Sequence, residues 1–136
     1  MARLRVAVVA GTRPEAIKLA PVVRALRARP SVETLFVSTG QHREMLRQVL
    51  AAFDLAPDLD LELMRPGQDL HDVTVAALQR LKPVLREWRP GWVVVQGDTT
   101  TAMAAALGAF YERVPVAHVE AGLSSCRPRQ IAARPR

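Results

Sequence analysis

The sequence predicts an α/β fold in which one doubly wound parallel sheet carries helices on both faces. Two observations lead to this prediction. Short apolar and β-branched runs, typical of strands buried on both faces, alternate along the 136 residues with longer segments of helical periodicity. Polar residues gather where the predicted strands end, which is where open α/β sheets bind their ligands. The alternation favours βαβ units with parallel strands and crossover helices.

The first half of the chain predicts two strand–helix units and a weak third strand. Pro14 suits the first turn of the first helix, because the N–H that proline lacks would have no partner there. Thr12 and Glu15 have the spacing of a capping box, although either Thr12 or Arg13 can be the N-cap. The predicted strands are residues 4–10, 32–38 and, weakly, 59–63, and the predicted helices are residues 14–28 and 41–53.

The second half predicts two further helices and two further strands. The longer helix carries apolar residues at three- and four-residue steps from Leu70 to Trp88, and the shorter one is rich in alanine, which allows close packing on a sheet. The predicted helices are residues 70–88 and 99–110, and the predicted strands are residues 92–96 and 114–119. Residues 1–123 are therefore expected to form one Rossmann-like domain, although the GxGxxG dinucleotide fingerprint is absent.

Residues 124–136 differ from the rest of the chain. They hold four of the 19 basic residues and none of the 13 acidic residues, and arginine and proline dominate. They have neither helical nor strand periodicity, so we expect a disordered tail. An abrupt end of the pattern at residue 123 is what a reading-frame shift in GC-rich DNA would produce. We therefore expect the chain to be an incomplete fragment.

The composition argues against several function classes. The net charge of +6 falls to +2 for residues 1–123, and only 4% of the residues are aromatic, so we expect no nucleic-acid partner. No apolar run approaches the roughly 20 residues of a membrane span. The start of the chain lacks the features of a signal peptide, which favours the cytoplasm. The single Cys126 excludes an internal disulfide, and no residue cluster has metal-ligand spacing.

The glycine loop before the first predicted helix favours anion binding. A helix N-terminus presents unpaired N–H groups and a partial positive charge. Arg13 adds a bidentate donor for phosphate oxygens, and Lys18 adds a mobile ammonium group. These residues suit a phosphate or diphosphate, and the alternative is a capped helix whose Arg13 and Lys18 are solvated. Gln41 and His42 begin the next helix, where they either bind a ligand or form a polar first turn.

Two carboxylates follow strands at the predicted ligand-binding edge. Asp98 follows the strand at 92–96, and it either caps the next helix or, if Thr99 is the cap, faces the cleft. Glu120 follows the last strand, where partial burial is expected to raise its pKa toward values useful for acid–base catalysis. His118 ranks below Glu120, because a histidine at such a place is more often hydrogen-bonded within the core. Asp98 and Glu120 are thus the candidate acid–base pair.

Four motifs, in this order, together resemble those of the bacterial non-hydrolysing UDP-N-acetylglucosamine 2-epimerases. They are GTRPEAIK at residues 11–18, TGQHR at 39–43, QGDTTT at 96–101 and HVEAGL at 118–123. The resemblance covers residues 4–123. It implies one Rossmann-like half of a GT-B architecture, in which the active site lies between two such domains. It also implies a homodimer for the intact enzyme.

The resemblance implies interconversion of UDP-N-acetylglucosamine and UDP-N-acetylmannosamine, which supplies cell-envelope polysaccharide synthesis. The C2 proton of this substrate is not next to a carbonyl, so the family eliminates UDP, forms 2-acetamidoglucal and adds UDP back. The route needs an acid, a base and a tightly held diphosphate, but no redox cofactor and no metal. The roles implied by the family are Arg13 and Lys18 near the diphosphate, Asp98 and Glu120 at the sugar, and Gln41 and His42 in a region where some members bind an activating UDP-N-acetylglucosamine.

Two alternatives remain at the level of the sequence. One is another GT-B protein, either a hydrolysing epimerase or a UDP-sugar glycosyltransferase. The other is a fragment without catalysis that binds a phosphate or a partner. All three share the predicted fold, so the fold alone does not separate them. We expect negligible epimerase activity from the isolated chain.

Overall fold

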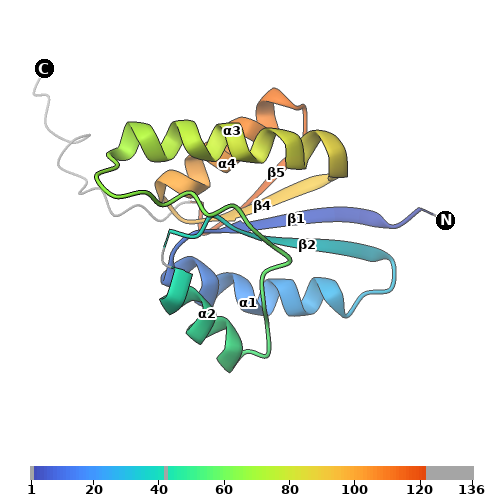
Figure 1. The fold of residues 1–136 in the computed structure, drawn as a ribbon. Coiled ribbons are helices and arrows are strands. Elements are labelled where there is room, and N and C mark those ends of the chain that lie inside the picture. Colours follow the sequence, from blue (N-terminus) through green and yellow to red (C-terminus); the bar gives the residue numbers. More distant parts are fainter. Residues whose placement is uncertain (1, 42, 122–136) are drawn as a thin grey trace, which may run out of the picture.

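The computed structural model describes residues 2–41 and 43–121. Five strands form one parallel sheet in the order β3-β2-β1-β4-β5, which confirms the predicted fold class (Figure 1). The strands are β1 (Leu4–Ala10), β2 (Val32–Ser38), β3 (Leu59–Asp60), β4 (Trp92–Gln96) and β5 (Val116–Val119). The helices are α1 (Arg13–Arg27), α2 (Arg43–Ala52), α3 (Leu70–Trp88) and α4 (Thr100–Tyr111).

The sheet separates two hydrophobic cores. Helices α1 and α2 cover one face and α3 and α4 cover the other, as Figure 1 shows. Alternate residues of β1 enter the two cores: Val8 packs with Phe36 on the α1 side, while Val9 packs with Leu81 on the α3 side. Burial of each such side chain contributes about 1.5–3 kcal/mol. The central strand is apolar on both faces because both faces are covered.

All nine predicted elements are present; β1, β2, β4 and α3 have the predicted bounds, and the other five differ by one to three residues at an end. Helix α4 begins at Thr100, since Thr99 has an extended backbone and its side chain caps the helix. β3 is shorter than predicted because Glu62 has a φ of 50°, a left-handed value that interrupts a strand. Leu61 and Leu63 still donate their N–H groups to Ser38 and Thr39 beyond the end of β2. This segment therefore extends along the sheet without forming a regular strand.

The topology determines where a ligand site can lie. β1 and β4 are neighbours, and the chain leaves them toward opposite faces of the sheet. The loops after these strands therefore diverge, and this topological switch point is the usual ligand site of an open α/β sheet. All five strands are parallel, so the segments that follow them share one edge.

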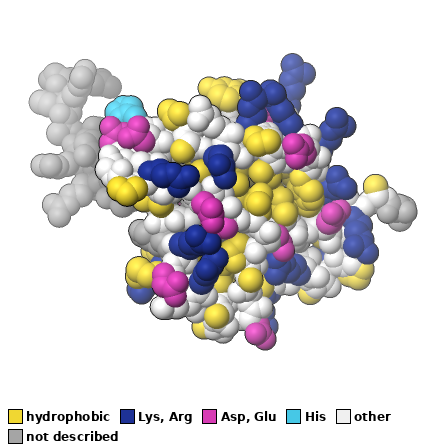
Figure 2. Space-filling view, in the orientation of Figure 1, with side chains coloured by type: hydrophobic (Ala, Val, Ile, Leu, Met, Phe, Trp, Pro, Cys, Tyr) yellow, Lys and Arg dark blue, Asp and Glu magenta, His cyan; other side chains and the backbone are white. Residues whose placement is uncertain are grey.

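The surface carries charges of both signs. On the face in Figure 2, Lys and Arg side chains are interspersed with Asp and Glu. Within the described residues, no helix has both the length and the apolar composition to cross a membrane. The predicted domain end at residue 123 and the predicted disorder of residues 124–136 lie outside the part of the chain that the structure describes.

Candidate functional site

Lys18 and Glu120 meet at the switch point although they are 102 positions apart in sequence. The Lys18 Nζ atom lies 2.5 Å from Glu120 Oε2, and the two side chains are 47% and 29% exposed. Gln96 Nε2 donates to the same carboxylate oxygen at 2.6 Å. The first turns of α1, the end of β4 and the residue after β5 thus contribute to one polar cluster. Of the predicted site residues, these two are in direct contact.

The pKa of the Glu120 carboxyl is lowered, so the predicted upward shift was wrong. The hydrogen bond from Lys18 is the largest cause, and burial opposes it. The positive charge of Lys18 and the hydrogen bond from Gln96 add to the lowering of the pKa. Desolvation alone raises this pKa, and the sequence does not show that an ammonium group lies beside the carboxylate. Glu120 is therefore an ionised carboxylate in this arrangement.

The backbone of Glu120 is itself unusual. Its φ of 58° lies in the left-handed region, which is uncommon for a residue other than glycine. Such a conformation costs about 1–3 kcal/mol and persists where surrounding contacts over-determine it. The bonds from Lys18 and Gln96 are contacts of that kind. The left-handed backbone and the ion pair together indicate that the fold fixes the position of this carboxylate.

Asp98 does not cap α4. Thr99 is the N-cap, and its Oγ1 atom accepts the N–H of Ala102 at 3.1 Å. Of the two arrangements left open by the sequence, the structure therefore has the one in which Asp98 is not used as the cap. Asp98 is exposed and follows Gly97, whose φ of 72° turns the chain at the end of β4.

Arg13 is the first residue of α1, and its side chain is exposed. Residues 2–41 and 43–121 contain no ion-pair partner for its guanidinium group. Lys18 lies about one and a half turns further along the same helix. Its side chain is half exposed and contacts Glu120. Arg13 and Lys18 thus provide two cations at the same edge of the sheet, one of them paired with a carboxylate.

Glu15 is a site residue that the sequence suggested only as part of a helix cap. Its side chain is 1% exposed, yet it is a carboxylate. One oxygen accepts from Gly11 N, Thr12 N and Thr12 Oγ1 at 2.9, 2.6 and 2.8 Å. The other oxygen accepts from Thr99 Oγ1 at 2.6 Å, across 84 positions of sequence. The capping-box spacing indicates the bond from Thr12 N, whereas the bonds from Gly11 N, Thr12 Oγ1 and Thr99 Oγ1 are not part of that motif.

A second polar layer lies beneath Gly11. Thr101 Oγ1 donates to Gln41 Oε1 at 3.3 Å and lies 3.4 Å from Thr39 Oγ1. These contacts link Thr39 and Gln41, in the loop after β2, to the first turn of α4. A Cβ atom on Gly11 would lie 2.4 Å and 2.6 Å from the Thr39 and Thr101 hydroxyl oxygens, so glycine is required there. Gln41 therefore serves the scaffold in this structure.

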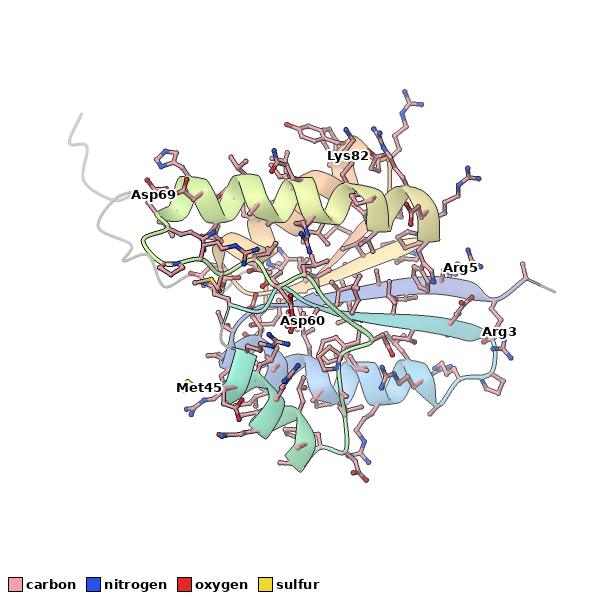
Figure 3. The ribbon with its side chains drawn as sticks, viewed as in Figure 1. Arg3, Arg5, Met45, Asp60, Asp69 and Lys82 are labelled. Atoms are coloured by element: carbon pink, nitrogen blue, oxygen red, sulfur yellow. The ribbon has the colours of Figure 1, made fainter. Side chains whose placement is uncertain are left out.

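The remaining candidates lie further out. His42 is outside the described residues. Arg43, at the start of α2, pairs with Glu62 at 3.0 Å and with Asp60 at 3.5 Å; Figure 3 labels Asp60 at the end of β3. His118 is exposed, so the expected core position was wrong, although its Nε2 atom lies 2.6 Å from the Gly97 carbonyl oxygen. Within the described residues, no three His, Cys, Asp or Glu side chains are grouped to hold a metal ion.

Comparison with known proteins identifies the family. The family model described as UDP-N-acetylglucosamine 2-epimerase matches residues 24–130, which is well over half of the chain. The chain belongs to this epimerase family. The match reaches past residue 123, where the resemblance argued from motifs ended.

A curated relative and a solved structure support the assignment to the epimerase family. The UDP-N-acetylglucosamine 2-epimerase of Escherichia coli K12 is 55% identical over 120 residues, covering 88% of this chain and 32% of the relative. The Neisseria meningitidis epimerase bound to UDP-GlcNAc is 44% identical with a TM-score of 0.85, covering 95% of this chain and 35% of that one. The chain therefore spans about a third of the length of the epimerases it matches.

The fold is also shared beyond the epimerases. The glycosyltransferase SnogD from Streptomyces nogalater has a TM-score of 0.61 and 20% identity, covering 85% of this chain and 33% of that one. At that identity the likeness concerns the fold alone. It agrees with the predicted Rossmann-like half of a GT-B architecture, which epimerases and such glycosyltransferases share.

Proposed function

We propose that this chain provides one side of the active site of a non-hydrolysing UDP-N-acetylglucosamine 2-epimerase. The observation that carries the proposal is the Lys18–Glu120 pair at the switch point, where a cation of α1 meets a carboxylate after β5. A ligand that carries both a diphosphate and a sugar needs such a combination: cations for one part and carboxylates for the other. A relative in the same family has been crystallised with UDP-GlcNAc.

Arg13 and Lys18 are proposed to hold the diphosphate. Arg13 has a guanidinium that is exposed at the first residue of α1, where the positive end of the helix also favours an anion. Lys18 contributes a mobile ammonium from the same helix. Positive charge at this place stabilises UDP as a leaving group, because charge develops on its terminal phosphate as the bond to the sugar breaks.

Asp98 and Glu120 are proposed to carry the proton transfers at C2 of the sugar. One carboxylate removes the C2 proton while the C1–oxygen bond breaks, giving 2-acetamidoglucal and UDP. The other group then delivers a proton to the opposite face of C2 as UDP adds back to C1, which forms UDP-N-acetylmannosamine. Both residues follow strands that are neighbours in the sheet, at the edge where α1 also begins.

The ion pair explains how Glu120 becomes a stronger base when substrate is present. In the chain without ligand, Lys18 keeps the pKa of the Glu120 carboxyl low, so the group is ionised and ready to accept a proton. A bound diphosphate competes for the Lys18 ammonium. As Lys18 turns toward the phosphate, the pKa of Glu120 rises and its affinity for the C2 proton increases.

Proton exchange at C2 separates this proposal from the alternatives. Incubation of UDP-N-acetylglucosamine in D₂O with an active protein that contains this domain should replace the C2 proton by deuterium and give UDP-N-acetylmannosamine, as followed by proton NMR. Release of UDP and free N-acetylmannosamine would indicate a hydrolysing epimerase. Release of UDP without deuterium at C2 would contradict both epimerase mechanisms and favour glycosyl transfer.

We propose that the isolated 136-residue chain binds but has little turnover, since it spans about a third of the relatives' length. Orientation of a substrate between two protein surfaces contributes up to about 7–11 kcal/mol to catalysis.

A homodimer is proposed for the intact enzyme. Large apolar side chains of α3 and α4 that remain 66–72% exposed, namely Leu70, Phe110 and Tyr111, are compatible with burial against a second copy. Light scattering would give the mass in solution.

A further inference from the structure

Glu15 is the most deeply buried charged side chain of the described residues, and the proposed chemistry does not use it. It is 1% exposed. Burial of a carboxylate is unfavourable unless hydrogen bonds replace its water. Here four donors do so, from Gly11 N, Thr12 N, Thr12 Oγ1 and Thr99 Oγ1. Three of these donors share Oε2 and the fourth bonds Oε1, so both oxygens of Glu15 are engaged by the protein itself.

Three of these four bonds are local to the start of α1. The bond from Thr12 N is that of a capping-box glutamate, and those from Gly11 N and Thr12 Oγ1 also fasten the loop before α1 to its first turn. The bond from Thr99 goes to a different loop, which follows β4. Thr99 in turn accepts the N–H of Ala102, so its hydroxyl connects Glu15 to the first turn of α4.

This connection spans the topological switch point. β1 and β4 lie side by side, but α1 and α4 leave them toward opposite faces of the sheet. A bond between the two helix starts opposes separation of the loops that precede them. Arg13 lies between Thr12 and Glu15 at one end of this connection, and Asp98 directly precedes Thr99 at the other.

We propose that Glu15 is a positioning residue that fixes the loop after β1 against the loop after β4. It thereby holds Arg13 and Asp98 at the separation that a nucleoside diphosphate sugar requires. The ligand named here rests on the proposed function. Glu15 acts through its neighbours and touches no reacting atom. Its charge matters because a carboxylate accepts with both oxygens, whereas an amide accepts with one and donates with the other.

The substitution Glu15→Gln separates positioning from electrostatics by the sign of its effect. Glutamine is a normal member of a capping box, so α1 should still form. Loss of a negative charge near an anion site should by itself strengthen binding of UDP. Loss of the link to Thr99 should weaken the binding of UDP. We expect the affinity for UDP to fall at least about tenfold, equivalent to about 1.4 kcal/mol.

The substitution Thr99→Ala tests the link without any ligand. If the link exists, the substitution should loosen the loop after β1 as well. The Gly11 and Thr12 amide protons should then exchange with solvent at least about tenfold faster, as measured by NMR, which corresponds to a fall of about 1.4 kcal/mol in the free energy of local opening. Thr99→Ser keeps the hydroxyl and should restore slow exchange. Asp69→Ala is the matched control, because it removes the comparable cap of α3, where Asp69 accepts from Asp72 N. Figure 3 labels Asp69 at the start of α3.

The two measurements give separable outcomes on the 136-residue chain. Faster exchange at Gly11 and Thr12 in Thr99→Ala, with weaker UDP binding in both Thr99→Ala and Glu15→Gln, supports the proposal. Unchanged exchange in Thr99→Ala overturns it, and so does UDP binding in Glu15→Gln that is as tight as in the wild-type chain. If the wild-type chain shows no chemical-shift change with UDP, the proposed function fails for this chain, and the exchange result alone decides whether Glu15 links the loops.

Discussion

The Lys18 ammonium and the Glu120 carboxylate illustrate how neighbours decide the chemistry of a residue. The sequence located both groups at the correct edge of the sheet, because parallel strands with apolar cores are easily recognised. It gave the wrong direction for the pKa of Glu120, because an ammonium 102 positions away becomes a neighbour only after folding. The burial of Glu15 was missed for the same reason, since its fourth donor comes from a distant loop.

Substitution of Lys18 tests the cause of the lowered pKa. In Lys18→Met we expect the pKa of the Glu120 carboxyl to rise, because the hydrogen bond and the positive charge that lower it are gone while burial still raises it. Titration of the Glu120 side-chain ¹³C signal by NMR measures this directly. Lys82→Met, on the outer side of α3 (Figure 3), should leave the pKa unchanged. An unchanged pKa in Lys18→Met would contradict the ion pair.

The same pair has a defined effect on stability. Because the folded-state pKa of Glu120 is lowered, the ion pair stabilises the fold at pH values above the ordinary pKa of a glutamate. This contribution is lost as the pH falls through the lowered value. The difference in free energy of unfolding between the wild type and Lys18→Met should therefore shrink on acidification below that range.

Alanine substitutions at Gly11 and Gly108 compare a crowded glycine with an uncrowded one. Alanine at position 11 would bring a Cβ atom within 2.6 Å of two buried threonine hydroxyls, so Gly11→Ala should destabilise the fold by about 1–3 kcal/mol. At position 108 the nearest atoms are 3.6 and 3.7 Å away, and alanine favours a helix by about 0.5–1 kcal/mol. Urea unfolding should show a loss for the first and no loss for the second. Equal stabilities would refute the close approach at Gly11.

At the scale of elements, the predictions were best where one physical signal dominated. β1, β2, β4 and α3 have the predicted bounds because their apolar patterns end at clear glycine, proline or capping residues. The prediction was less accurate for β3, where Glu62 has a left-handed backbone, and for β5, which begins two residues later than expected. Such ends depend on contacts with neighbouring strands, which local sequence does not contain.

The cap of α3 allows an independent test at the element scale. Asp69 accepts from Asp72 N at 2.9 Å, and Asp72 accepts from Asp69 N at 3.0 Å. Asp69→Ala should cost about 1 kcal/mol in free energy of unfolding, the usual value for an N-cap. Asp69→Asn keeps an acceptor and should cost less. Equal losses for Ala and Asn in urea unfolding would show that the side-chain oxygen does not cap the helix.

At the scale of the whole molecule, the sheet order brings four separated segments to one edge. The segments after β1, β2, β4 and β5 include the predicted candidates, and the contacts of Glu15, Gln96 and Thr101 connect them. The sequence predicted this convergence from strand–helix alternation, but not the contacts that hold the segments together. The proposed roles of Arg13 and Asp98 rest on this placement.

The proposed roles of the two carboxylates give a prediction for turnover. In a protein that contains this domain and is active, Asp98→Asn and Glu120→Gln should each reduce the rate of C2 deuteration at least about a hundredfold, the usual scale for general acid–base catalysis. Lys82→Met serves as the control outside the site. A near-normal rate in either carboxylate variant would assign that residue a structural role.

The place where UDP-N-acetylglucosamine binds on the 136-residue chain tests the proposed site most directly. Backbone amide shifts in a ¹⁵N-labelled sample, followed during titration with this nucleotide sugar, report the location residue by residue. We predict that the largest changes occur at Arg13, Lys18, Asp98 and Glu120, and that Lys18→Met weakens binding. Changes centred instead on the outer groove between α3 and α4, at Lys82 and Arg86, would contradict it, as would the absence of any change.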